Sequence, residues 1–503
     1  MKKSLVAIGV IVILGAAWTG GAWYTGKQFE QRLPSVVADA NMRIKTAFPE
    51  MGVKLVVEDY QRHLFSSRVN VVLVSDGSTG DNKPLKPEDR IVINEIIDHG
   101  PFPLGQLKKG VIIPSMASVY SQLDTTPLVK PLMEASQGKS PLTAVTRVSY
   151  NGDTVSDITL VPFDFKNATS LLSTNGGNVN LSIDHELNKV AAKGNIGSLV
   201  IGGVNQWQQH EQVALQNLSL DSTTHKGQQD YSIGDNTLKV KTLTYSIDGK
   251  DILSTDNLSQ ITSANEDNGK LSAQVAYSLD ALHVRGQDFG SGKLMLKLSN
   301  LDPKAIAQFS QQYQAQAQQI MQQTGNVDPA LQQQQISHAL LQNLPIALKG
   351  NPYLMIAPLS WKNSKGESVF NLTLNLNDPS QSPASEAAGM LPLLPYVNKL
   401  DAKLSIPLDM ATELTTQVGK LQGYSDDDAQ KLAKQQIQGL AAMGQMFKLT
   451  TVKDNTLTSS LQYADNQVNL NGQKMSLKSF LGLFGLFGLP DSEQAQPQTQ
   501  PQP

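Results

Sequence analysis

The side chains that could do acid–base chemistry or bind metals are few and scattered in this chain of 503 residues. Neither His185-Glu186 nor His210-Glu211 is followed by the second histidine that a zinc-binding helix needs to bring two imidazoles to one face. The absence of cysteine excludes thiolate metal sites, iron–sulfur clusters and disulfides. We therefore expect no metal site, no cofactor, and a surface or structural role for each histidine: His63, His99, His185, His210, His225, His283 and His338.

Motifs for nucleophilic catalysis and phosphate binding are missing as well. The chain has no G-x-S-x-G turn of the kind that exposes a catalytic serine. The segment Gly286 to Lys293 fails as a phosphate-binding loop, because Gln287 stands where the first glycine is required and Leu294 replaces the metal-binding hydroxyl. A Ser, His and Asp brought together only by folding would escape this search. On the residues alone we predict that the protein is not an enzyme.

Three consecutive carboxylates, Asp426, Asp427 and Asp428, have two interpretations. They could belong to a metal site, or they could lie in the first turn of a helix, where the helix dipole stabilises negative charge. Ser425, immediately before them, is a favourable N-cap residue. We favour a helix that begins here and runs to about Phe447.

The charge balance argues against a nucleic-acid partner. The chain has 41 basic and 44 acidic residues, a net charge of −3, and no basic patch interleaved with aromatic residues. Its hydrophobic content of 40% is ordinary for a folded protein.

An apolar run near the N-terminus precedes every element that could position a site. Residues Leu5 to Tyr24 contain no charged side chain and follow Lys2 and Lys3. Twenty helical residues span roughly 30 Å, the thickness of the hydrocarbon core of a bilayer. We predict a transmembrane anchor over residues 4–24, with membrane contacts from Leu5, Ile8, Val12, Leu14, Trp18 and Trp23.

A cleaved signal peptide is the alternative, because a Lys-Lys start, an apolar centre and Gly15-Ala16-Ala17 also fit one. The apolar character continues through Trp18 and Trp23, which favours an anchor. The basic residues before the run predict that residues 1–3 lie in the cytoplasm. The rest of the chain is then exported and held at the membrane by a single span.

Alternating apolar residues predict antiparallel strands over much of the chain, after a short helix over Ser35 to Phe48 that follows Pro34. Asn-Gly or Asp-Gly dipeptides supply the positive φ values that two-residue hairpin turns need, and they begin at positions 151, 175, 248, 268 and 471. The expected sheet has one apolar and one polar face. The apolar face must be covered by helices, a second sheet or bound lipid.

The segment Tyr60-Gln61-Arg62-His63-Leu64-Phe65-Ser66-Ser67 lies between two of these predicted strands. Together with the N-terminal anchor and the turn Asn469-Leu470-Asn471-Gly472-Gln473, it resembles the YdgA-like family of bacterial envelope proteins. The resemblance covers nearly the whole chain and implies an inner-membrane protein with a periplasmic domain and no established activity. His63 departs from the pattern, which has glycine there. The strands are also distantly similar to those of AsmA-like envelope proteins, which implies a long sheet with an apolar groove for lipid.

Two glutamine-rich segments, Ala305 to Gln323 and Ala330 to Leu344, predict a helical hairpin joined at Gly325. Disorder is the alternative for such low-complexity sequence. Near the C-terminus, Phe480 to Leu489 is too short to span a bilayer as a helix. It either packs on the open sheet face or contacts membrane or a partner through Phe480, Phe484 and Phe487.

We therefore predict an α+β protein: a transmembrane helix and then a β-rich domain of antiparallel meander sheet with helical insertions. The expected divisions are a cytoplasmic N-terminus (1–3), an anchor (4–24), a periplasmic β-rich region (25–300), a helical insertion (301–350), a C-terminal α+β region (351–489) and a disordered tail (490–503). The leading hypothesis for function is envelope maintenance by binding or guiding acyl chains on the apolar sheet face. The alternative is a scaffold that binds another envelope protein or a second copy of the chain.

Overall fold

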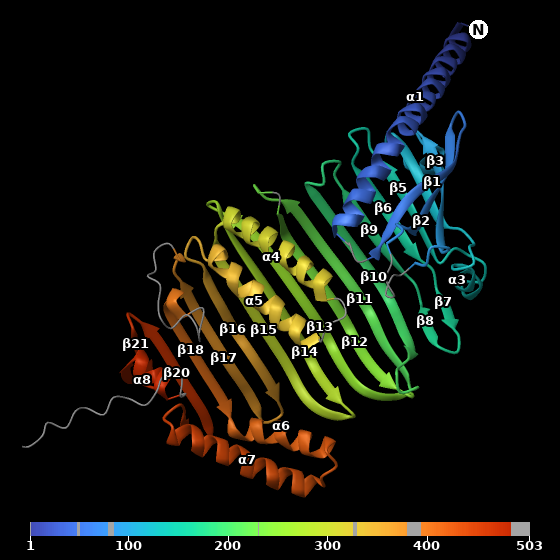
Figure 1. Cartoon of the computed structure of the whole chain (residues 1–503). Coiled ribbons are helices and arrows are strands. Elements are labelled where there is room, and N and C mark those ends of the chain that lie inside the picture. Colours follow the sequence, from blue (N-terminus) through green and yellow to red (C-terminus); the bar gives the residue numbers. More distant parts are fainter. Residues whose placement is uncertain are drawn as a thin grey trace, which may run out of the picture. The chain divides into compact units, whose positions relative to one another are not determined.

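The computed structural model of the chain describes residues 2–47, 51–78, 85–229, 231–324, 329–379 and 394–483 (Figure 1). Side chains are described from Trp18 onward, except at positions 321–324, 329 and 330. The chain forms two compact units. The N-terminal unit comprises residues Met1–Lys226 and Asn236–Ile252, and the C-terminal unit comprises Gly227–Asp235 and Leu253–Pro503.

The N-terminal unit begins with one long helix, α1 (Lys2–Ala47), which continues through Pro34. The expected second helix after Pro34 is therefore a continuation of the first. Proline removes one backbone donor inside a helix. In the same turn, the hydroxyl of Ser35 donates to the carbonyl of Arg32 at 2.7 Å. The predicted anchor residues Leu5, Ile8, Val12 and Leu14 lie outside the described side chains. Among the residues that were described, no helix is long and apolar enough to cross a membrane.

The sheet of the N-terminal unit is an antiparallel meander. Its spatial order is β1–β2–β3–β4–β5–β6–β9–β10–β11. Strand β10 extends past the end of β9 and there pairs β8, which in turn pairs β7. The strands are β1 (Val53–Arg62), β2 (Ser66–Ser75), β3 (Arg90–His99), β4 (Ala117–Leu123), β5 (Leu142–Val148), β6 (Thr154–Leu160), β7 (Phe163–Lys166), β8 (Ser170–Thr174), β9 (Gly177–Ile183), β10 (Lys189–Val204) and β11 (His210–Lys226), and two short helices, α2 (Leu104–Leu107) and α3 (Lys130–Ala135), lie in the connections.

The two faces of this sheet differ in polarity. On one face, Val69, Ile97, Ala117 and Val119 form a buried core against which Phe29 and Leu33 of α1 pack, among other residues. On the other face, the strand register aligns an uncharged polar row across β2 to β6 and β9 to β11: Asn70, Asn94, Gln122, Thr143, Thr159, Asn178, Asn195 and Ser219. Helix α1 therefore covers the part of the apolar face that lies near β1, β2 and β3.

The C-terminal unit repeats the meander with longer strands in the order β13–β14–β15–β16–β17–β18–β20–β21–β22, and β19 also pairs β20. The strands are β14 (Lys270–Val284), β15 (Gln287–Leu301), β16 (Tyr353–Asn363), β17 (Gly366–Leu376), β18 (Val397–Pro407), β19 (Thr451–Lys453), β20 (Thr456–Ala464), β21 (Gln467–Leu470) and β22 (Gln473–Ser476). Strands β12 (Ser232–Ile247) and β13 (Lys250–Asp267) contribute residues to both units.

Helices accompany this second sheet in two pairs (Figure 1). The predicted helical hairpin is present as α4 (Pro303–Thr324) and α5 (Pro329–Ala347), which contact each other. Its predicted connection at Gly325 lies outside the described residues. Helices α6 (Leu408–Leu421) and α7 (Asp426–Met446) form the second pair, and α6 packs against β15 to β18. A last short helix, α8 (Leu477–Gly482), follows β22.

The predicted turns are present with a difference in backbone conformation. Both residues have positive φ in Asp248-Gly249, Asn268-Gly269 and Asn471-Gly472, as a type I′ hairpin requires. In the dipeptides at positions 151 and 175 only the glycine has positive φ. The first lies in the longer β5–β6 connection, residues 149–153, and the second joins β8 to β9, which both pair β10 and not each other.

Candidate functional site

The first candidate site is the junction between α1 and the β1–β2 hairpin, within the segment that carries the family resemblance. The ring of Trp18 lies 5.5 Å from that of Phe65, centroid to centroid. Glu30 forms an ion pair with Arg62 at 3.1 Å. Farther along the helix, the Asn41 amide both donates to the carbonyl of Leu55 (2.9 Å) and accepts from its N–H (2.7 Å). Side chains along α1 thus hold the helix against the edge of the sheet. The two bonds of Asn41 pair with the backbone of β1 as a neighbouring strand would.

Small residues let the helix approach the β3–β4 loop closely. Ala22 is fully buried, and a Cβ added at Gly26 would lie 2.4 Å from Cε1 of His99. The hydroxyl of Thr25 donates to the carbonyl of Gly100 at 3.3 Å. Glycine at position 26 is therefore required by contact with the histidine ring rather than by its backbone angles.

Beneath this contact lies a buried chain of polar side chains. His99 is 2% exposed and Ser67 is 0% exposed. The Nε2 atom of His99 lies 2.8 Å from Ser67 Oγ, which lies 3.1 Å from the hydroxyl of Tyr60. The Nδ1 atom faces the carbonyl of Leu64 at 3.3 Å.

The partners of His99 fix its tautomer. Burial lowers the pKa of His99, so the ring is neutral and has one donor and one acceptor. A carbonyl can only accept, so Nδ1 carries the proton and donates to Leu64, and Nε2 accepts from the hydroxyl of Ser67. Burial likewise raises the pKa of Tyr60, so its hydroxyl is available as the donor to Ser67.

A serine bonded to a histidine also occurs in catalytic dyads, and the geometry here decides against that role. Ser67 Oγ belongs to a side chain with no exposed surface, and α1 covers the histidine ring. The histidine is oriented by a backbone carbonyl instead of a carboxylate, unlike the catalytic triad arrangement. The Ser67–His99 pair therefore has a structural role in the interface between α1 and the sheet.

The second candidate site is the apolar face of the C-terminal sheet. Pairing registers place apolar side chains of seven strands in one row, and a second apolar row lies beside it. The first row is Val275, Leu296, Ile356, Leu372, Ala402, Leu461 and Leu470, and the second is Ala273, Leu298, Leu354, Leu374, Leu400, Tyr463 and Val468. On the reverse face, the row Gln274, Lys297, Met355, Thr373, Asp401, Gln462 and Asn469 is mostly polar.

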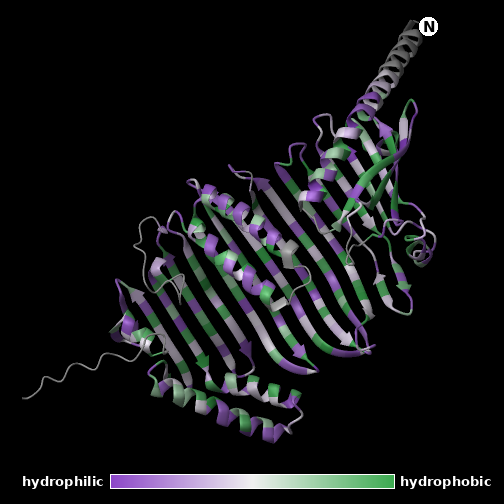
Figure 2. Cartoon of the chain, in the orientation of Figure 1, coloured by the Kyte–Doolittle hydropathy of each residue, from purple (hydrophilic) through white to green (hydrophobic). Residues whose placement is uncertain are grey.

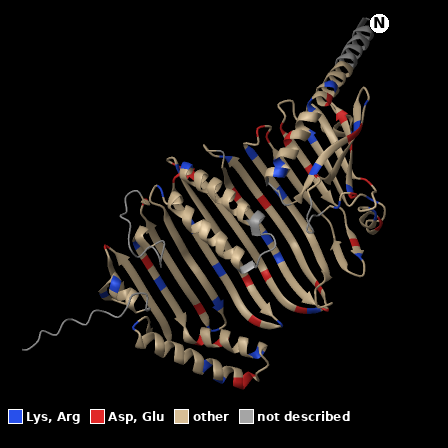
Figure 3. Ribbon diagram, viewed as in Figure 1, with Lys and Arg blue, Asp and Glu red and all other residues tan. Residues whose placement is uncertain are grey.

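A third row on the apolar side consists of Tyr277, Leu294, Leu359, Phe370, Leu404 and Ser459. Figure 2 shows the resulting alternation of hydrophobic and hydrophilic residues along the strands. Charged residues are spread over many of the strands (Figure 3).

Helices cover this face only in part. Leu344 and Leu348, at the end of the α5 segment, pack with Leu374 and Leu376. At the other end of the strands, Met410 of α6 is buried and its carbonyl accepts from the Asn363 amide at 3.0 Å. Between these contacts Leu296, Ile356 and Leu372 are half-buried, and Leu359 (46%) and Tyr277 (42%) are exposed.

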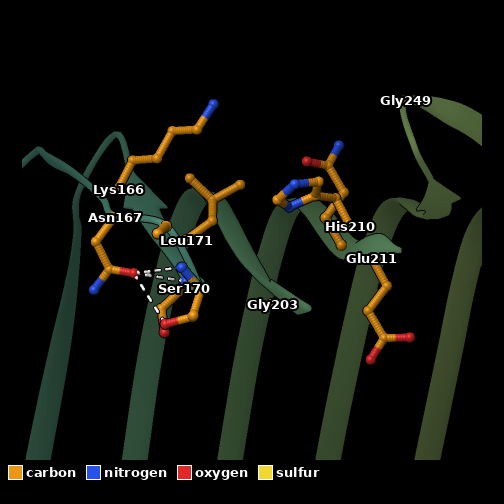
Figure 4. Close-up of a pocket in the computed structure, with 11 residues that line it drawn as sticks. Lys166, Asn167, Ser170, Leu171, Gly203, His210, Glu211 and Gly249 are labelled. Atoms are coloured by element: carbon orange, nitrogen blue, oxygen red, sulfur yellow. Dashed lines mark hydrogen bonds between the residues drawn. The ribbon is translucent and has the colours of Figure 1, made fainter. Parts of the chain in front are cut away.

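A third candidate is a surface cavity of about 420 Å³ in the N-terminal unit, formed by the β7–β8 turn and the facing ends of β10 and β11 (Figure 4). The Oδ1 atom of Asn167 accepts from the backbone N–H groups of Thr169 and Ser170, so this residue shapes the turn. His210 and Glu211 point away from each other, as consecutive strand residues do. Glu211 instead accepts from the hydroxyl of Tyr245 at 3.1 Å, which raises the pKa of Tyr245. The cavity therefore contains no acid–base pair.

Ser425 caps α7, and the three acids after it lie in the first turn of that helix, as predicted. The Ser425 hydroxyl accepts from the N–H of Asp428 at 3.2 Å, and α7 begins at Asp426. Within the described part of the chain, no group of three or more His, Cys, Asp or Glu side chains is placed to hold a metal ion.

Comparison with known proteins agrees with the resemblance seen in the sequence. A family model described as a bacterial protein of unknown function (DUF945) matches residues 1–478. The chain belongs to this family. It is 43% identical to protein YdgA of Escherichia coli (strain K12) over 490 residues, which cover 97% of each chain.

Two more distant relatives are described as uncharacterised proteins. Protein YihF of the same strain is 28% identical over 496 residues, 97% of this chain and 99% of its own. A protein of Haemophilus influenzae is 26% identical over 188 residues, 37% of this chain and 49% of its own. No solved structure matches the chain.

The remaining predicted contact residues fall in different places. Trp18 is half-buried against Phe65, whereas Trp23 is 48% exposed with Lys27 Nζ 5.5 Å from its ring centroid. Phe480 lies half-buried in α8. Phe484 and Phe487 lie outside the described residues. Sequence reasoning missed the Ser67–His99 pair because the two residues are 32 positions apart. The register of β2 and β3 brings them together.

Proposed function

We propose that this protein is anchored in the inner membrane by α1, lies otherwise in the periplasm, and binds or guides acyl chains on the apolar face of its C-terminal sheet. The observation that carries the proposal is the set of three apolar rows, two across β14 to β18, β20 and β21 and one that ends in β20. The uncharged run Leu5 to Tyr24 supports the anchor.

The dimensions of the face suit a hydrocarbon chain lying across the strands. Seven strands are separated by six spacings of about 4.8 Å, which makes each full row roughly 29 Å long. One acyl chain occupies about half of the 30 Å hydrocarbon core of a bilayer, or roughly 15 Å. The α5 segment packs on the second row, at Leu354, Leu374 and Leu400. The first row has no residue in that contact and therefore has room for a complete acyl chain.

The chemistry of the face also favours hydrocarbon over polypeptide. A peptide lying on it would bring backbone N–H and C=O groups that require partners. In the three rows the only polar groups are the hydroxyls of Ser459, Tyr277 and Tyr463. An acyl chain brings no group that would be left without a hydrogen bond.

A binding titration with a fluorescent fatty acid tests the proposal. Replacing Leu296 and Ile356 together by Glu puts two charges in the middle of the first row, and we expect at least a tenfold weaker Kd, equivalent to about 1.4 kcal/mol. The matched control replaces Met295 and Met355, on the reverse face of the same strands, by Glu. The control should bind as the wild type does. Equal binding by both variants, or no binding by the wild type, would contradict the proposal.

A further inference from the structure

The connection between β3 and β4 presents large apolar side chains to solvent. Ile112 is 74% exposed and Ile113 is 54% exposed. Phe102, Leu104 and Leu107 of the same loop are each more than one-third exposed. Five such residues within twelve positions form an exposed apolar cluster of the kind that marks an interaction surface. We call residues 100–116 the β3–β4 loop.

This loop is held in one conformation by hydrogen bonds. The side chain of Gln106 is buried and donates to Ser118 Oγ at 3.0 Å. The N–H of Gly105 donates to Asp98 Oδ2 at 2.7 Å, and the N–H of Ser115 donates to the carbonyl of Pro101 at 2.9 Å. The apolar side chains are thus displayed by an ordered loop.

The base of the loop lies against α1, next to the predicted anchor. A Cβ added at Gly21 would lie 2.8 Å from Cδ of Pro101, and Thr25 bonds to Gly100. The neighbouring β1–β2 turn adds Leu64, which is 45% exposed. The apolar loop residues therefore belong to the part of the unit that is nearest the C-terminal end of the apolar run Leu5 to Tyr24.

Two lysines accompany the apolar side chains. Lys108 and Lys109 are both exposed and follow Leu107 directly. Apolar residues inserted at the boundary of headgroups and acyl chains, with lysines in the headgroup layer, are the usual chemistry of a membrane-surface contact. Each lysine near an anionic surface also contributes electrostatic attraction.

We infer that the β3–β4 loop inserts its apolar side chains into the surface of an anionic lipid bilayer. This contact is made by the folded unit itself, in addition to α1, and it is separate from acyl-chain binding on the C-terminal sheet. It would fix the orientation of the N-terminal unit on the membrane, since a single helix alone leaves the unit free to rotate about the helix axis.

The absence of cysteine in the chain allows a direct test. The full chain with Ile112→Cys, labelled with an environment-sensitive fluorophore, is reconstituted into vesicles of phosphatidylethanolamine and phosphatidylglycerol. We expect the emission to shift to shorter wavelength and to be quenched by lipid that carries a nitroxide on its acyl chain. Trp207→Cys is the matched control, because Trp207 is 71% exposed in the β10–β11 turn. Its label should show neither change.

Three results would overturn the inference. The first is emission at position 112 that stays at the wavelength seen in water. The second is a shift without quenching by the nitroxide lipid, because it would place the loop against protein. The third is undiminished quenching in neutral phosphatidylcholine vesicles or after Lys108→Glu and Lys109→Glu together, because it would remove the role of anionic lipid.

Discussion

At the scale of single residues, the fastening of α1 depends on a neutral histidine beneath a glycine. Gly26 leaves room for the ring of His99, and the two nitrogens of that ring join Leu64 to Ser67. Protonation of His99 would turn Nε2 into a donor and place a charge beneath α1. The charges that act on the pKa of His99 are those of Arg62, which disfavours the charged form of the ring, and Asp98, which favours it.

The stability of the protein should therefore depend on pH through His99. Its pKa is lower in the folded chain than in the unfolded chain, so unfolding takes up a proton as the solution becomes acidic. The free energy of unfolding should be highest above the unfolded-state pKa of about 6.5 and should fall as pH decreases below it.

Chemical denaturation at a series of pH values measures this effect. His99→Gln should reduce the slope of stability against pH in that window. His63→Gln changes an exposed histidine in the nearby turn and should leave the slope as it is. A wild-type slope that His99→Gln does not change would refute the role assigned to this ring.

A pair of glycine variants tests the close contact. Gly26→Ala forces a methyl group against His99, and overpacking of this kind costs about 1–3 kcal/mol. Gly20→Ala, where a Cβ meets nothing within 4 Å, should only gain helix propensity, up to about 1 kcal/mol. Gly26→Ala gains the same helix propensity, so it should be the less stable of the two by the overpacking cost alone, about 1–3 kcal/mol in chemical denaturation. Equal stabilities would mean that the helix does not pack on the ring.

At the scale of elements, the N-terminus of helix α7 depends on capping by Ser425. Ser425→Ala should destabilise α7 by about 0.5–2 kcal/mol, because the N–H of Asp428 loses its acceptor. Ser425→Thr should retain most of the stability. Thermal or chemical denaturation gives the difference. A change in divalent-metal affinity without a change in stability would instead favour the metal interpretation of the acidic cluster.

Elements with regular apolar alternation could be predicted from the sequence. Strands β9, β14, β15 and β17 follow Val, Leu and Ile residues at every second position, and both Gln-rich helices begin at an Asp-Pro pair. The long strands β10 and β11 were missed, because Gly, Ser, Thr and Asn interrupt the apolar pattern and their pairing depends on neighbouring strands.

Other errors came from local pattern without tertiary context. Leu408 continues the alternation of β18, yet it is the first residue of α6, which was not predicted. Leu477 likewise opens α8. The region before Leu142 contains α2, β4 and α3, none of which could be placed from the sequence. The apolar rows were predictable as a face, but their alignment needed the strand registers.

At the scale of the whole molecule, both units contain an antiparallel meander sheet with one apolar and one polar face. In the N-terminal unit, α1 covers the apolar face around Ile97 and Val119. In the C-terminal unit, α5 and α6 cover the ends and leave the rows around Leu296 and Ile356 half-buried. The face that lacks complete cover is where the account places an acyl chain.

Native mass spectrometry of the full-length protein, extracted in mild detergent, tests this central claim most directly. The account predicts a species heavier than the polypeptide by one defined lipid mass, which is lost in the variant with Leu296 and Ile356 both replaced by Glu. A clean polypeptide mass, or a mass shifted only by another protein, would contradict it.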